Sequence, residues 1–203
     1  MAEPQEALPQ FKHIRRYWDS SRHIFVAKIL PGEVYVTKHH ELVTTLLGSC
    51  IAVCMRDRFN KIGGMNHFKL PKPSADLDNE ENTNYGIYAM ELLINEILKN
   101  GGKRHHLECA IYGGGNVIKN ISADIGGKNI AFVSHFLEEE KIPVVHKDVG
   151  HTAAQQVYYH PLSGNAFSVV KENMSMAELK KVEQEYMSAI NKEMDKPSIT
   201  YFD

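Results

Sequence analysis

Short apolar segments separated by glycine, proline and asparagine turns make up most of this chain. The stretch HIFVAKILPGEVYVTK (23–38) alternates apolar and polar residues on both sides of Pro31-Gly32, which predicts two strands joined by a turn. IAVCM (51–55) is apolar at every position, as in a strand that is buried on both faces. Asn60-Lys61 then predicts a turn into another short strand, which contains GGMNHF (63–68).

Two later segments have helical periodicity instead. In NYGIYAMELLINEILKNGG (84–102) apolar residues recur at helical spacing, and the closing Asn-Gly-Gly predicts the end of the helix. NIAFVSHFLEEEK (129–141) predicts a second amphipathic helix with Asn129 as its N-cap. Further strands are expected over 107–113, 142–150, 155–161 and 165–171. Strands that cluster before and after two helices predict an α+β fold with a mixed sheet rather than regular βαβ alternation.

Composition and charge narrow the class of protein. The 203 residues, 43% hydrophobic and 24% charged, suit one globular domain with extensions. The net charge of −2 predicts no general attraction to nucleic acid. No apolar run approaches the roughly 20 residues that a membrane-spanning helix needs. The odd number of cysteines, three, favours free thiols in a reducing cytoplasm over a disulfide framework.

Cys50 is the first candidate for chemistry because it follows Gly48-Ser49 at the point where a strand begins. Small residues before it allow a tight turn, on which backbone N–H groups can donate to an oxyanion. A cysteine there needs a base, since a free thiol is mostly protonated at neutral pH. The candidate base is His67 on the strand after the 60–61 turn, which we expect to pair with the strand that follows Cys50. Thr44, Thr45 and Asn66 are candidates for the group that orients the imidazole.

Structural explanations compete with this hypothesis. Cysteine is among the most buried residue types, and we interpret Cys54 and Cys109, each inside an apolar strand, as ordinary core residues. A zinc site is the competing chemistry, but the cysteines and histidines lack the usual ligand spacings. The glycines at 113–115 lack the pattern of a phosphate-binding loop, so we expect a tight turn there.

Several motifs together resemble a known family. TTLLGSCIAVCMRD (44–57), GGMNHFKLP (63–71), YGIYAMELLI (85–94), IYGGGNVI (111–118), IGGKNI (125–130) and DVG (148–150) occur in the order and spacing of the CheD family, the chemoreceptor glutamine deamidases of bacterial and archaeal chemotaxis. The resemblance covers about residues 27–171. It implies a cysteine hydrolase of α+β type, a layered mixed β-sheet sandwich with flanking helices, similar to the catalytic domains of deamidating toxins. Together with the mixed, proline-containing start and the polar helical pattern near the end, it divides the chain into an N-terminal arm (1–22), a CheD-like domain (23–172) and a C-terminal helical extension (173–203).

The resemblance also implies the roles of particular residues. The nucleophile falls on Cys50 and the general base on His67, while the orienting residue falls on Thr44, with Thr45 as its adjacent rival. Glutamine side chains on the cytoplasmic helices of chemoreceptors would be hydrolysed to glutamate through a cysteine thioester, with release of ammonia. No cofactor and no metal is implied.

Three further expectations concern the contacts of the oxyanion, the partner proteins and one position at which the sequence departs from the family. Ser49 and Asn66 are expected to contact the substrate or its oxyanion. A CheC-type phosphatase is a second expected partner, and a binding module that docks it or receptors with little activity of its own is the alternative function. The family commonly continues the DxG segment with a second glycine and an arginine, whereas here His151 follows Gly150 and the arginine is missing.

Overall fold

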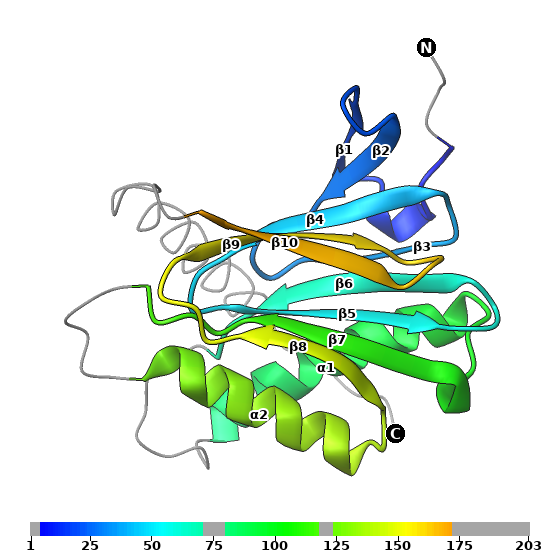
Figure 1. Cartoon of the computed structure of the whole chain (residues 1–203). Helices are drawn as coiled ribbons and strands as arrows, with labels where there is room; N and C mark the ends of the chain where they lie inside the picture. The colour runs from blue at the N-terminus through cyan, green and yellow to red at the C-terminus, as the bar shows by residue number, and fades with distance from the viewer. Residues whose placement is uncertain (1–4, 71–79, 118–123, 172–203) are drawn as a thin grey trace.

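Two five-stranded β-sheets packed face to face form the body of the protein (Figure 1). The computed structural model describes residues 5–70, 80–117 and 124–171, with the side chains of the first helix described from Tyr85 onward. The first sheet contains, in spatial order, β1 (Arg15–Asp19), β2 (Ile24–Lys28), β4 (Glu41–Leu47), β9 (Ala154–His160) and β10 (Asn165–Lys171). The second sheet contains β3 (Val34–Thr37), β6 (Ile62–Phe68), β5 (Ile51–Asp57), β7 (Leu107–Gly113) and β8 (Val144–Val149).

Both α-helices, α1 (Glu80–Lys99) and α2 (Ile125–Glu139), lie on the outer face of the second sheet (Figure 1). Two short 3₁₀ helices, η1 (Pro9–Phe11) and η2 (Arg104–His106), precede β1 and β7. Each sheet is mixed, because β2 pairs parallel with β4 in the first sheet and β7 pairs parallel with β8 in the second. The predicted α+β class with mixed, layered sheets is therefore confirmed. Among the described residues, neither helix has the length and apolar character needed to cross a bilayer.

The hydrophobic core occupies two layers. Between the sheets, Val43, Leu47, Val157 and Tyr159 of the first sheet are almost fully buried. On the other face of β5, Ile51, Val53 and Met55 have no exposed surface and pack toward the helices. Strand β5 is thus covered on both faces, as the continuous apolar run at 51–55 predicted.

The Pro31-Gly32 turn joins two strands, as predicted, but they lie in different sheets, β2 in the first and β3 in the second. One predicted helix start is wrong. Helix α2 begins at Ile125, four residues before Asn129, and its N-cap is Asp124, whose carboxylate accepts from the Gly127 N–H at 2.9 Å. The N-terminal arm predicted for 1–22 contains β1, which pairs antiparallel with β2. The C-terminal extension predicted for 173–203 lies outside the described residues.

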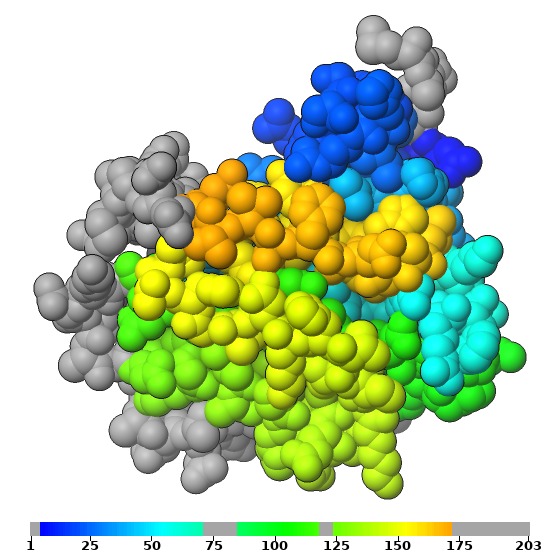
Figure 2. Space-filling view, in the orientation of Figure 1, coloured from blue at the N-terminus to red at the C-terminus, as the bar shows by residue number. Residues whose placement is uncertain are grey.

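A buried carboxylate joins the N-terminal segment to both sheets. Glu41 on β4 is 1% exposed, and its two oxygens accept from Tyr35 and Thr37 of β3 and from the guanidinium of Arg16 on β1. The contacts from Arg16 measure 2.8 Å from Nε and 2.7 Å from Nη2. The β1–β2 hairpin projects from the body (Figures 1 and 2). Strand β1 pairs with β2, and the ion pair between Arg16 and Glu41 connects it to β4 as well.

We expect Arg16→Ala to lower the free energy of unfolding by about 3 kcal/mol, because it leaves the Glu41 carboxylate buried without its charged partner. Arg15→Ala, which removes an exposed arginine from the same strand, is the matched control and should change stability by less than about 0.5 kcal/mol. Urea unfolding of both variants measures the difference, and equal midpoints would contradict the role given to Arg16.

Candidate active site

The register of β5 and β6 brings Cys50 and His67 to the same end of the second sheet. His67 lies opposite Ala52 in this antiparallel pair. Cys50 immediately precedes β5, and the first residue of that strand, Ile51, pairs with Phe68, the neighbour of His67. Both residues are buried: Cys50 is 4% exposed and His67 1%. The antiparallel pairing predicted from the 60–61 turn is therefore present, and it brings the start of β5, which follows Cys50, to the end of β6 that contains His67.

A hydrogen-bond chain across the two sheets fixes the tautomer of His67. The Oγ1 atom of Thr45, on β4, lies 2.7 Å from Nδ1 of His67 and 3.0 Å from the carbonyl oxygen of Ile29. A carbonyl can only accept, so the single hydroxyl proton of Thr45 goes to Ile29. The hydroxyl oxygen must then accept from Nδ1–H, which leaves the lone pair of His67 on Nε2.

Thr44 does not make the contact expected of the orienting residue. Its hydroxyl donates to the carbonyl of Val157 at 2.7 Å and accepts from Nε2 of Gln156 at 2.6 Å. Successive residues of a strand face opposite sides of the sheet, so Thr45 faces His67 and Thr44 faces away from the second sheet. The imidazole is contacted by Thr45, the rival that adjoins Thr44.

Burial keeps the imidazole neutral. Loss of hydration lowers the pKa of His67 from 6.5 to about 3. At neutral pH the ring is therefore uncharged, and its Nε2 can take a proton from a neighbouring acid.

A glycine loop holds the backbone on either side of the candidate nucleophile. The N–H of Gly114 donates to the carbonyl of Cys50 at 2.7 Å, and the N–H of Gly115 donates to the carbonyl of Gly48 at 2.8 Å. Gly113 has φ +100°, and a Cβ at this position would lie 2.2 Å from the Cys50 carbonyl oxygen. The tight turn expected at 113–115 is not formed: Gly113 ends β7, and the irregular segment after it runs beside the Cys50 turn, an approach that a side chain at Gly113 would block.

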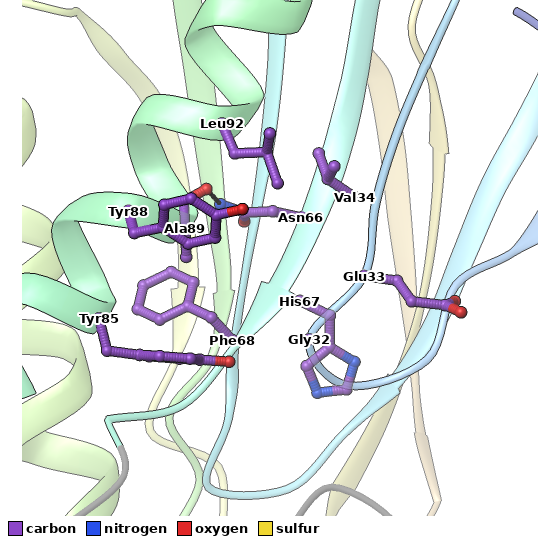
Figure 3. Close-up of a pocket in the computed structure, with 10 residues that line it drawn as sticks. All are labelled: Gly32, Glu33, Val34, Asn66, His67, Phe68, Tyr85, Tyr88, Ala89 and Leu92. Atoms are coloured by element: carbon purple, nitrogen blue, oxygen red, sulfur yellow. Dashed lines mark hydrogen bonds between the residues drawn. The ribbon is translucent and has the colours of Figure 1, made fainter. Parts of the chain in front are cut away.

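Asn66 is committed to packing on the helix side of the sheet. Its Oδ1 accepts from the Val53 N–H at 3.0 Å, and its Nδ2 donates to the Ala89 carbonyl of α1 at 3.0 Å (Figure 3). As the neighbour of His67 on β6, it projects from the opposite face. The expectation that Asn66 contacts an oxyanion near Cys50 is therefore corrected.

A pocket lies beside His67, between the turn at 32–34, strand β6 and helix α1 (Figure 3). The His67 backbone is pinned to this turn, since its carbonyl accepts from the Gly32 N–H at 2.7 Å and its N–H donates to the Glu33 carbonyl at 3.0 Å. Tyr85 points its hydroxyl toward the side on which Gly32 and His67 lie, and Tyr88, at the rim, is 60% exposed.

The remaining cysteines are core residues, as predicted. Cys54 is 1% exposed and Cys109 2%, and no disulfide involves any of the three cysteines. Burial raises the pKa of the Cys54 thiol well above its usual value and that of Cys109 to about 12. Both thiols therefore stay protonated and unreactive at neutral pH. Within the described part of the chain, no three His, Cys, Asp or Glu residues gather as a metal site would require.

Comparison with known proteins identifies the family. The model of the CheD family, described as CheD chemotactic sensory transduction, matches residues 69–170. A protein of Halorhodospira halophila is 44% identical over 169 residues, which cover 80% of this chain and 78% of that protein. This chain belongs to the CheD family. A relative from Saccharophagus degradans is 42% identical over 93% of this CheD-family chain and 90% of its own length, and one from Methylobacillus flagellatus is 47% identical over 73% and 75%.

All three relatives carry the name "Probable chemoreceptor glutamine deamidase CheD". Among solved structures, the chain is similar to the hypothetical protein YfiH of Bacillus licheniformis, with a TM-score of 0.39 and 15% identity over 59% of this chain and 51% of that one. This likeness is too distant to assign the CheD-family chain to a fold.

His151, at which the sequence is expected to depart from the family pattern, contacts the same glycine loop. Its carbonyl accepts from the Asn116 N–H at 2.9 Å, and its Nε2 lies 2.6 Å from Oδ1 of Asp148. The other oxygen of Asp148 accepts from Gln155 at 2.5 Å and from Ser168 at 2.6 Å. The departure in sequence thus adds a side chain to a polar cluster that joins β8 to β9 and β10.

The lowered pKa of His67 predicts a specific acid sensitivity. The unfolded chain binds a proton near pH 6.5 and the folded chain only near pH 3, so stability is lost as the pH falls between these values. This one group should lower the free energy of unfolding by about 1.4 kcal/mol per pH unit in that window. We expect His67→Gln to flatten this part of the profile in urea unfolding. His135→Gln, at an exposed position of α2, is the matched control, and identical slopes for His67→Gln and wild type would contradict the assignment.

Proposed function

We propose that this chain is a cysteine-dependent protein-glutamine deamidase that converts glutamine side chains of chemoreceptors to glutamate. Its membership of the CheD family and the names of its relatives support the reaction and the substrate. The observation that carries the catalytic assignment is the neutral, oriented imidazole of His67, on the strand that pairs with the one after Cys50. The proposed substrate, a cytoplasmic helix of a receptor, would place the reaction in the cytoplasm.

The proposed reaction is an acyl transfer with one group moving the protons. Nε2 of His67 takes the thiol proton of Cys50, and the thiolate attacks the carboxamide carbon of the glutamine. The resulting imidazolium returns the proton to the leaving nitrogen as the C–N bond breaks, so ammonia departs and a thioester remains. His67 then removes a proton from water, the hydroxide attacks the thioester, and the thiol and the glutamate are released. Thr45 holds the imidazole in orientation throughout.

Backbone N–H groups at the Cys50 turn are the proposed oxyanion donors. The carbonyl of Gly48 points to the glycine loop, where it accepts from Gly115. In a trans peptide the following N–H points the opposite way, so the N–H of Ser49 is directed away from this loop. We assign it to the oxyanion in place of the Asn66 side chain. Preorganised donors of this kind supply a large part of the rate of acyl transfer.

A CheC-type phosphatase is proposed as a second partner. The alternative function, a binding module that docks such a phosphatase or a receptor with little activity of its own, is not favoured, because the relatives are named as deamidases. The two functions differ in what a wild-type protein does to a receptor fragment: the deamidase releases ammonia, and the binding module does not.

We expect Cys50→Ala and His67→Ala each to abolish release of ammonia from a purified receptor fragment, because one removes the nucleophile and the other its base. Mass spectrometry of the fragment detects the conversion of glutamine to glutamate directly. Cys54→Ala, which removes a buried thiol four residues away, is the control and should retain activity if it folds. Full activity in Cys50→Ala would rule out the proposed mechanism, and inactive wild type on receptors of the same cell would favour the binding module.

Two adjacent threonines provide a matched test of the orienting residue. Thr45→Val leaves the Nδ1–H of His67 without its acceptor, and we expect kcat to fall roughly tenfold to a hundredfold, as on loss of the outer partner of other oriented histidines. Thr44→Val removes a hydroxyl that is equally buried and also hydrogen-bonded, and should leave kcat close to wild type. The reverse order of the two kcat values would restore Thr44 to the role.

A further inference from the structure

Asn129 on the first turns of α2 connects the two segments that carry the candidate catalytic residues. It has no exposed surface. Its Nδ2 donates to the carbonyl of Ser49 at 2.7 Å, and its Oδ1 accepts from the N–H of Leu70 at 3.0 Å. Ser49 immediately precedes Cys50, and Leu70 lies three residues after His67. One buried amide therefore bridges the turn before the nucleophile and the segment after the base.

The contact with Ser49 fixes the direction of the peptide group between Ser49 and Cys50. No peptide bond in the described chain is cis, so the Cys50 N–H points opposite to the Ser49 carbonyl. Asn129 draws that carbonyl toward α2, which directs the Cys50 N–H away from the helix. The adjoining carbonyls of Gly48 and Cys50 are held by the glycine loop, and neither of those contacts sets the orientation of this peptide group.

Helix α2 is itself held against the same glycine loop, so the side chain of Asn129 projects from a helix whose position is fixed. A Cβ on Gly126 would lie 2.2 Å from the carbonyl oxygen of Gly114, and only a glycine allows the first turn of α2 to approach so closely. Asp124 caps this turn through the Gly127 N–H. A side chain anchored on a rigid helix start positions its partner more accurately than one on a loop would.

We propose that Asn129 is a positioning residue for acyl transfer, which holds the Ser49–Cys50 peptide so that the Cys50 N–H donates to the oxyanion. The inference rests on the function proposed above, but it concerns only the step in which a carbonyl oxygen gains negative charge. The side chain of Asn129 bonds to the backbone at Ser49 and Leu70, so its removal should slow that step and leave the reactivity of the thiol itself intact.

Two reactions of Cys50 separate these effects. Iodoacetamide alkylates the thiolate sulfur with loss of iodide and forms no oxyanion. p-Nitrophenyl acetate acylates the same sulfur through an oxyanion, with loss of p-nitrophenolate and formation of an acetyl thioester. Mass spectrometry assigns each product to Cys50 rather than to Cys54 or Cys109. The ratio of the acylation rate to the alkylation rate reports oxyanion stabilisation, and circular dichroism of each variant shows that the folded protein is being compared.

The variants are Asn129→Asp, which keeps the acceptor for Leu70 but loses the donor to Ser49, and Asn129→Ala, which loses both. We expect the ratio to fall about tenfold or more in each, and kcat for the receptor fragment to fall by a similar factor with little change in KM. Asn95→Asp, at an exposed position of α1, is the matched control and should behave as wild type.

An unchanged ratio in Asn129→Asp, or an equal loss of both rates, would overturn the inference, because the amide would then be structural only. Failure of the proposed function has a different signature. If wild-type protein left receptor glutamines intact, the deamidase assignment would fail, while the ratio measured with the two small reagents would still decide the role of Asn129.

Discussion

The hydrogen bond between His67 and Thr45 is the constraint on which the site depends, because it joins the two sheets at the place where the chemistry is proposed. Its geometry requires β4 and β6 to face one another at a fixed spacing, and the hydrophobic layer between the sheets maintains that spacing. The same layer strips water from the imidazole and lowers its pKa. Packing between the sheets thus sets the position, the tautomer and the charge of the candidate base together.

The nucleophile turn is held from outside the sheets. The glycine loop at 113–115 holds the carbonyls on both sides of Ser49, and Asn129 holds the carbonyl of Ser49 itself. With all three carbonyls held, the peptide groups of the turn have fixed orientations, and preorganised N–H donors are what the proposed oxyanion requires. The glycines are needed because a side chain at 113, 114 or 126 would occupy the space of a neighbouring carbonyl or side chain.

Much of this could be predicted from the sequence, and the exceptions have physical causes. Local signals located Cys50 and His67, since small residues and a turn mark both segments, and the buried strand at 51–55 was equally clear. The choice between Thr44 and Thr45 depends on which face of β4 meets the second sheet, and a stretch that is buried at both positions does not reveal that. Asn129 was interpreted as a helix cap because its real partners, Ser49 and Leu70, lie 80 and 59 residues away. Strand β1 lacks the alternation of apolar and polar residues that marks a half-buried strand. The ion pair between Arg16 and Glu41 connects it to the body of the protein.

The contact of the Thr45 hydroxyl with a carbonyl has a consequence for the movement of protons. The chain from Nδ1 through the hydroxyl ends at Ile29, whose oxygen can take no proton onward. On its Nδ1 side the imidazole therefore has no onward proton acceptor, and in the proposed mechanism protons enter and leave the ring at Nε2. A proton taken up at Nε2 is returned from Nε2, which matches the proposed cycle, in which the ring passes its proton to the leaving nitrogen and later to the thiolate.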